Sequence, residues 1–153
     1  MALRGFFNKL TCTMCLVVGL GLGLGPAGCG DDGPTGSFLV QHEGQEVTWS
    51  AAKIGELPQA TVAIGEHVYS GAAFADVVLA SGVERDAAIE VVVVGLDGYR
   101  QTISGTRLWE PGVLLAGRDH DKPLIKDGPW RLVISGSPGL SVRNVARISI
   151  KSR

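Results

Sequence analysis

The chain has 153 residues, of which 45% are hydrophobic and 19% charged, with a formal net charge of −1. This length allows one domain, and the composition excludes a coiled coil and a disordered acidic chain. The near-zero net charge excludes nucleic acid as the expected partner, because phosphate binding needs a basic face.

Residues 1–28 have the layout of a secretory signal. Their only charges are Arg4 and Lys9, and an apolar stretch over residues 10–24 leads to a small-residue exit. A membrane-spanning helix needs about 20 apolar residues, so this shorter, glycine-containing stretch favours a cleaved signal over a permanent helix. Cys12 and Cys15 lie inside it and are given no functional role.

Cys29 follows directly, in the order Pro26-Ala27-Gly28-Cys29, and a polar, glycine-rich tether comes after it. This arrangement resembles the lipobox of bacterial lipoproteins, although Pro26 stands where a lipobox usually has an aliphatic residue. The resemblance implies cleavage before Cys29 and lipidation of its thiol. The alternative is a secreted protein cut near Ala27, with Cys29 free or cross-linked. We expect a flexible tether over residues 29–37 and a lipid-anchored protein of the bacterial cell envelope, periplasmic or on the outer surface.

The predicted domain spans residues 38–153 and contains no cysteine. It therefore has no disulfide, no thiolate metal ligand and no cysteine nucleophile. Without Arg4 and Lys9 the chain keeps 12 basic and 15 acidic residues, a net charge of −3. This balance does not steer the protein toward anionic partners.

Hydrophobic patterning predicts a strand-rich α+β domain, with one mixed sheet and two or three short helices. Ser50 is expected to cap the first helix, which Leu57-Pro58 ends, and Gly82 ends the second. The run Ile89–Val94 has five β-branched residues and predicts a central strand buried on both faces. The expected order begins with strands 38–41 and 46–49, a helical turn from 51, a strand over 59–64 continued by 67–69, and a helix over 74–79. It continues with strands 89–94, 100–104 and 113–116 and a polar loop over 117–122. The last elements are a strand ending at 134 and a strand over 142–150.

The order of these elements resembles the oxidoreductase molybdopterin-binding domain, the central fold of the sulfite oxidase family. The resemblance runs from Glu46 to Ile150 and depends on the order and spacing of several short motifs. These are Leu57-Pro58, Tyr69-Ser70-Gly71, Asp97-Gly98-Tyr99, Pro123-Leu124 and Gly128-Pro129-Trp130-Arg131-Leu132-Val133.

The resemblance implies a site with two departures from the family pattern. Catalytic members supply a cysteine thiolate to a pterin-bound molybdenum, and this domain has no cysteine. Members that hold the pterin phosphate carry Gly-Lys-Ser-x-Lys, where Leu140 here replaces the first lysine. The candidate cofactor-binding residues are Tyr99, Arg131, Ser141 and Arg143. For Arg131 we favour a structural ion pair, with Asp97 or Asp127 as acceptor.

These departures predict a non-catalytic binding or scaffold module with no catalytic residue, no metal ligand and no cofactor. One alternative is a periplasmic molybdopterin-dependent oxidoreductase, or a subunit of one, that uses a non-cysteine or partner-supplied metal ligand. Another is a binder of a small anion or metal at the remnant of the site. The expected partners are the membrane, through the N-terminal lipid, and a protein or small anion.

Two further patterns favour structural roles. Asp119-His120-Asp121 is expected to be a solvated hairpin tip, because a metal site would need His42 and His67 to converge on it. Ser50-Ala51-Ala52-Lys53 matches the Ser-x-x-Lys pattern of penicillin-binding enzymes, but the partner motifs are absent.

Overall fold

The computed structural model describes residues 36–85, 87–126 and 128–153. The predicted signal over residues 1–28, Cys29 and the tether up to residue 35 lie outside the described residues, so they stay predictions. Within the described ranges, no helix has the length and apolar character needed to cross a bilayer.

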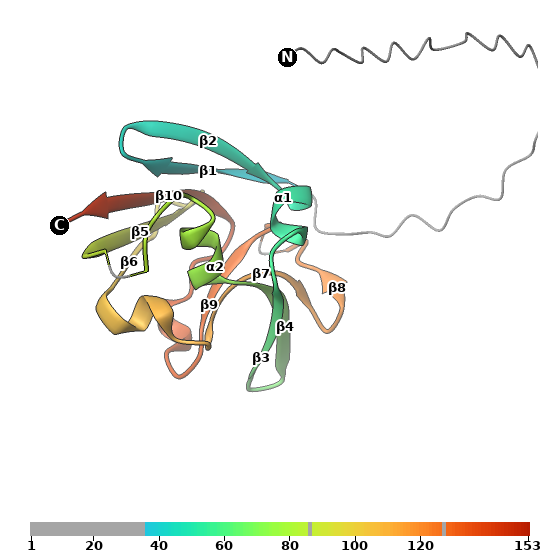
Figure 1. Ribbon diagram of the computed structural model, residues 1–153. Coiled ribbons are helices and arrows are strands. Elements are labelled where there is room, and N and C mark those ends of the chain that lie inside the picture. Colours follow the sequence, from blue (N-terminus) through green and yellow to red (C-terminus); the bar gives the residue numbers. More distant parts are fainter. Residues whose placement is uncertain (1–35, 86, 127) are drawn as a thin grey trace, which may run out of the picture. The chain divides into compact units, whose positions relative to one another are not determined.

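The first sheet has five strands in the order β2-β1-β10-β5-β6 (Figure 1). Its β1–β10 pair is parallel and its other pairs are antiparallel, which confirms the predicted mixed sheet. The strands are β1 (Ser37–His42), β2 (Gln45–Ser50), β5 (Ile89–Gly95), β6 (Arg100–Ser104) and β10 (Val145–Ser152).

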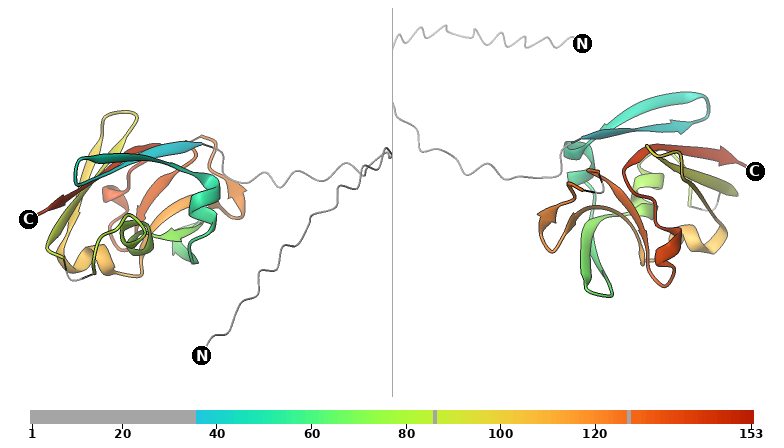
Figure 2. Two further views of the ribbon diagram at one scale, coloured as in Figure 1. Left: turned by 45° about the horizontal axis from the view of Figure 1, so that its top comes forward. Right: turned by 180° about the vertical axis from the view of Figure 1, so that it is seen from behind.

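The second sheet is antiparallel and is built around β7, which pairs with β4, β8 and β9. The β3–β4 hairpin forms its other edge and extends away from the first sheet (Figures 1 and 2). Its strands are β3 (Gln59–Ile64), β4 (His67–Ala73), β7 (Val113–Asp119), β8 (Lys122–Pro123) and β9 (Arg131–Ile134). The chain thus has two sheets where one was predicted.

Two short α-helices connect the sheets, and both begin and end close to the predicted residues. Ser50 caps α1 (Ala51–Gly55) by accepting a hydrogen bond from the Lys53 amide at 3.4 Å. Helix α2 (Phe74–Leu79) is followed by Gly82, whose φ of +87° suits glycine. Two 3-10 helices, η1 (Gly105–Trp109) and η2 (Pro138–Leu140), were not predicted.

The main apolar cluster lies between the two sheets and includes the buried face of α2. A smaller cluster lies on the opposite face of β7 and β9, against the β3–β4 hairpin. All buried members of both clusters lie between Phe38 and Ile150. A chain beginning at residue 30 therefore contains the complete described core and can be expected to fold alone.

The doubly buried strand is β7, and the prediction for Ile89–Val94 is wrong. Alternate residues of β5 are buried and half-buried, because only one face of the first sheet is covered. In β7 five consecutive residues, Val113–Gly117, are buried, since an apolar cluster lies on each side. A run of β-branched residues marks a central strand but does not show how many of its faces are covered.

Two strand boundaries also differ from prediction. The expected loop over residues 117–122 is the tip of a β7–β8 hairpin, where His120 and Asp121 adopt φ of 47° and 61°. The last strand begins at Val145 because Val142 forms an isolated bridge with Leu132 and Asn144 has a φ of 48°. The prediction of a solvated tip is confirmed for His120 and Asp121, which are exposed, but Asp119 is half-buried.

Candidate functional site

Tyr99 contacts the segment that carries Ser141 and Arg143. Its hydroxyl donates a hydrogen bond to the Gly139 carbonyl oxygen at 3.4 Å, and its ring is 43% exposed. The Asp97 carboxylate accepts a hydrogen bond from the Tyr99 amide at 2.9 Å and so fixes the turn between β5 and β6. The structure thus brings Tyr99 close to the stretch that the family uses for a phosphate.

The β5–β6 turn is joined to the same segment through the backbone. The Leu96 amide donates to the Asn144 carbonyl oxygen at 3.0 Å. A side chain at Gly95 would lie 2.7 Å from the Arg143 carbonyl oxygen, so the two backbones are in direct contact. This close approach holds the exposed Arg143 beside the turn.

Leu140 differs in character from the lysine that the family has at this position. Its side chain is only partly exposed and packs against the main apolar cluster. Val142, two residues later, is fully buried and bonds to Leu132 through both backbone groups. Only Ser141, which is half-buried, and Arg143 remain as polar side chains on this stretch.

Arg131 makes a structural contact with Tyr69 on the second sheet. Its Nη1 donates to the Tyr69 hydroxyl at 2.9 Å, and its guanidinium carbon lies 5.1 Å from the centre of the Tyr69 ring. Tyr69 itself is 3% exposed. Of the two predicted acceptors, Asp97 accepts from Tyr99, and Asp127 lies outside the described residues. The contact with Tyr69 was not foreseen, and the ion pair of Arg131 with Asp127 stays a prediction.

A histidine–aspartate pair extends this cluster toward the β7–β8 tip. His67 stacks on Tyr69 with ring centres 5.5 Å apart, and its Nδ1 donates to Asp119 at 2.6 Å. His120 lies 3.8 Å from the other Asp119 oxygen and donates to the Glu66 carbonyl oxygen at 2.6 Å. His67 and His120 therefore meet at Asp119.

The environment of Asp119 lowers its pKa. Burial alone would raise the pKa of this carboxyl, but hydrogen bonds from His67 and the Val68 amide, together with the charges of His67 and His120, outweigh burial. His42 is elsewhere, donating to the Ser81 carbonyl oxygen at 3.1 Å. In the described part of the chain, no group of three or more histidine, cysteine, aspartate and glutamate side chains is placed to hold a metal.

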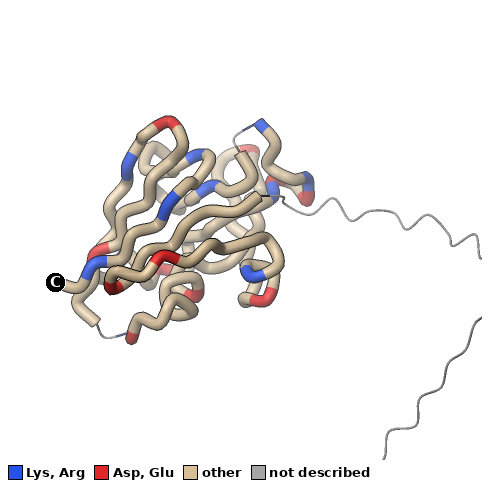
Figure 3. Tube along the Cα trace, turned by 90° about the horizontal axis from the view of Figure 1, so that it is seen from above, with Lys and Arg blue, Asp and Glu red and all other residues tan. Residues whose placement is uncertain are grey.

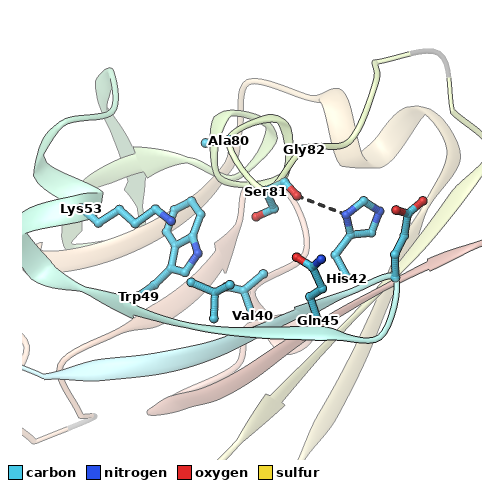
Figure 4. A pocket seen from close by; sticks show the side chains of 10 residues that line it. Val40, His42, Gln45, Trp49, Lys53, Ala80, Ser81 and Gly82 are labelled. Carbon is cyan, nitrogen blue, oxygen red and sulfur yellow. Dashed lines mark hydrogen bonds between the residues drawn. The ribbon is translucent and has the colours of Figure 1, made fainter.

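A cavity of about 290 Å³ lies between the β1–β2 hairpin and the end of α2 (Figure 4). Its wall includes Trp49, and the Lys53 amine lies 4.1 Å from the centre of the indole ring. His42 and Ser81 also line it and are joined by the hydrogen bond drawn in Figure 4. None of the candidate cofactor-binding residues Tyr99, Arg131, Ser141 and Arg143 lines it. Sequence reasoning missed this cavity because the hairpin and Ser81 are about 40 positions apart and meet only in the fold.

Comparisons with known proteins identify the architecture. The model of the oxidoreductase molybdopterin binding domain matches residues 40–153. The chain belongs to this family. The structure is similar to that of the sulfane dehydrogenase SoxCD from Paracoccus pantotrophus, with a TM-score of 0.64 and 15% identity. The match covers 76% of this chain and 38% of the sulfane dehydrogenase chain, so this chain spans less than half the length of that protein. A search of curated proteins finds no match.

The side chains at the family's cofactor positions do not fit a molybdenum–pterin group of the kind that the sequence resemblance implies. No cysteine occurs from residue 30 to the end of this sequence, so the domain has no thiolate for the metal. Leu140 packs on the core where a phosphate would need a cation, and Arg131 is engaged with Tyr69. The family fold is therefore present with a different set of donors.

Proposed function

We propose that this chain is a lipid-anchored protein of the bacterial cell envelope whose molybdopterin-family domain is a binding module without molybdenum catalysis. The observation that carries the proposal is the packing of Leu140 against the apolar core, at the position of the family's first phosphate-binding lysine. A half-buried aliphatic side chain that packs on the core cannot neutralise a phosphate.

The absence of cysteine from the domain supports the same conclusion from the metal side. A fold by itself does not confer chemistry, which depends on the groups placed at the site. The alternative, an oxidoreductase subunit that receives its thiolate from a partner, is an outcome of the first experiment below.

The proposed binding surface consists of the exposed side chains of Tyr99 and Arg143 and the half-buried Ser141. A phenol, a hydroxyl and a guanidinium together suit an anionic group, on a small molecule or on a partner protein. We expect Arg143→Ala to abolish binding of inorganic phosphate measured by calorimetry, with Arg85→Ala as the matched control. An Arg143→Ala variant that binds inorganic phosphate with the affinity of the parent would exclude this surface as the binding site.

The first experiment is a cofactor assay on residues 30–153 produced in a host that makes molybdopterin. Metal analysis and oxidised-pterin fluorescence are read on the same sample, beside a catalytic member of the family made in the same host. We expect neither cofactor here and both in the control. Near one molybdenum and one pterin per chain would overturn the non-catalytic proposal and direct a search for the replacement ligand. Cofactor acquired only after mixing with an envelope extract would support the subunit alternative.

The second experiment tests the anchor on the full chain expressed in a bacterium. Mass spectrometry of the membrane-extracted protein should show an N-terminal Cys29 that carries fatty acids, and the Cys29→Ser variant should leave the membrane fraction. An unmodified chain that begins near Cys29 would support plain secretion.

A further inference from the structure

One face of the first sheet is not covered by any other described element. On it, half-buried apolar side chains of β5 lie between exposed cations of β6 and β10, and Leu39 of β1 lies on the other side of β10. Figure 3, which looks down on the molecule from above, shows lysine and arginine positions along the strands. This surface, the basic face, comprises Leu39, Val92, Val94, Leu96, Arg100, Arg147 and Lys151.

The register places two arginines in one row across the basic face. Val94 pairs with Arg147 on one side and with Arg100 on the other. Adjacent strands are about 4.8 Å apart, so the two arginine backbones lie about 10 Å from each other with Val94 between them. Both side chains are exposed, and this spacing suits two neighbouring anionic headgroups.

Of the described carboxylates on and beside the basic face, only Glu90 is paired with a cation, whereas Glu46 and Asp97 are hydrogen-bonded to neutral groups and keep their charge. Glu46 accepts a hydrogen bond from Gln41 at 2.6 Å, and Glu90, opposite Lys151, is paired with Arg153 at 2.9 Å. Asp97, next to Leu96 in the β5–β6 turn, accepts from the Tyr99 amide. Arg100, Arg147 and Lys151 outnumber these two carboxylates, so the face keeps an excess of positive charge.

Leu96 projects from the turn at the end of the basic face and is 71% exposed. An exposed leucine beside two arginines has the composition of a membrane-surface contact, in which the apolar side chain enters the headgroup region and the cations bind phosphate.

The described chain begins at the edge of this same face. Gly36 is fixed there by a hydrogen bond from the Trp130 indole at 3.3 Å. Gly36, Leu39 and Leu96 line one shallow depression, which continues into the basic face through Leu39 and Leu96. A tether that leaves from this point would draw this side of the domain toward its anchor.

The length of the tether limits how far the domain can move away. Six residues lie between Cys29 and Gly36, so seven Cα-to-Cα steps join them. Fully extended they span at most about 25 Å, and a glycine-rich chain of this length averages about 15 Å. A domain held this close to a bilayer repeatedly meets the surface, so even a weak contact would be well populated.

We propose that the basic face docks on the anionic headgroup surface of the membrane that holds the protein. This inference rests on the proposed lipid anchor for its location, but the contact itself depends only on residues of the domain. Docking would fix the orientation of the domain and leave the β3–β4 hairpin, on the far side in Figure 1, directed away from the bilayer.

The test replaces the lipid with a histidine tag at the N-terminus of residues 30–153, bound to vesicles through a nickel-chelating lipid. Because this part of the sequence has no cysteine, Leu96→Cys accepts a single environment-sensitive fluorophore. Vesicles of phosphatidylcholine alone are compared with vesicles that also contain phosphatidylglycerol. We expect a blue shift only with phosphatidylglycerol and its loss at high salt, because salt screens surface charge. A label at Glu66→Cys, in the β3–β4 turn, should not shift.

The Arg100→Gln/Arg147→Gln pair tests the charges. Each cation near an anionic surface contributes roughly a fivefold preference, so the ratio of docked to undocked chains should fall about 25-fold. The control pair, Arg85→Gln/Lys122→Gln, has the same net charge and should change the ratio less than twofold. Urea midpoints equal to the parent show that both variants fold.

Three results would overturn docking by the basic face: no lipid-dependent shift at position 96, an equal shift at position 66, or an equal loss in the control pair. Because the tag supplies the anchor, failure of Cys29 lipidation in the full chain leaves this assay unaffected. The two proposals can therefore fail separately.

Discussion

Replacing Gly71 with alanine should destabilise the domain strongly, because this glycine lies where two strands of the second sheet come unusually close. Gly71 is buried in β4, pairs with Ala116 of β7, and adjoins a register irregularity at Ser70. A methyl group there would overlap the Leu115 carbonyl oxygen and lie 2.6 Å from the Ala116 Cα. Both obstacles are backbone atoms of a doubly buried strand, so no side chain can rotate away.

The expected cost follows from what must move. Overpacking a core costs typically about 1–3 kcal/mol, and shifting β7 disturbs both apolar clusters, so we expect about 3 kcal/mol. For a domain of this size that corresponds to a fall in Tm of roughly 12 °C. Gly55→Ala is the matched control, because Gly55 ends α1 with nothing within 4 Å of an added methyl group. It should stabilise the domain by about 0.5–1 kcal/mol.

Urea unfolding followed by tryptophan fluorescence measures both variants, since Trp49 and Trp130 are each 1% exposed. The slope of the free energy of unfolding against urea should stay constant, so that the midpoint alone reports the change. A Gly71→Ala protein within about 1 kcal/mol of the parent would show that β4 and β7 separate easily, contrary to the reasoning.

Three further variants test the packing and the electrostatics. Trp130→Ala should lower the free energy of unfolding by about 4 kcal/mol, because a fully buried indole leaves a large cavity, and urea midpoints would show it. Tyr69→Phe should cost about 1.5 kcal/mol because it removes one hydrogen-bond acceptor of Arg131, and an unchanged stability would show that this hydrogen bond is not structural. The lowered pKa of Asp119 means that its carboxylate favours the folded state above the ordinary value of 3.8 and that this contribution is lost as pH falls through the lowered value. Asp119→Asn should therefore be less stable than the parent at pH 7 and approach it at acidic pH, and midpoints that differ equally at all pH values would contradict the assignment.

Local sequence signals predicted most element boundaries of the fold. The strands 59–64 and 100–104 agree with prediction at both ends, and Ser50 and Gly82 act at the helix ends as expected. These features depend on neighbours within a few positions, which patterning detects well. The division into two sheets was missed because it depends on which strands pair, as with β1 and β10, more than 100 residues apart.

The candidate site was predictable only in part, for a related reason. Tyr99 and the segment of Ser141 and Arg143 were placed together by the order of family motifs, and the structure brings them into contact. The contact of Arg131 with Tyr69, on β4 beyond the intervening strand β7, was not foreseen, whereas its expected ion pair with Asp127 involves a residue outside the described ones and stays a prediction. The contact between Arg131 and Tyr69 depends on strand register, because a shift of one residue would turn Arg131 to the other face of the sheet.

The motifs that carry the family resemblance have mainly architectural roles in this structure. Tyr69 binds Arg131, Gly71 permits the close approach of β4 to β7, and Asp97 fixes the turn before Tyr99. Each of these contacts stabilises the fold whatever the domain binds, so a chain can keep them while its site residues change. Family membership therefore predicts the architecture, whereas the chemistry depends on a few other positions, such as residue 140. At that position the aliphatic side chain packs on the core, which is why the cofactor assay, more than any further comparison of folds, decides between a binding module and an oxidoreductase.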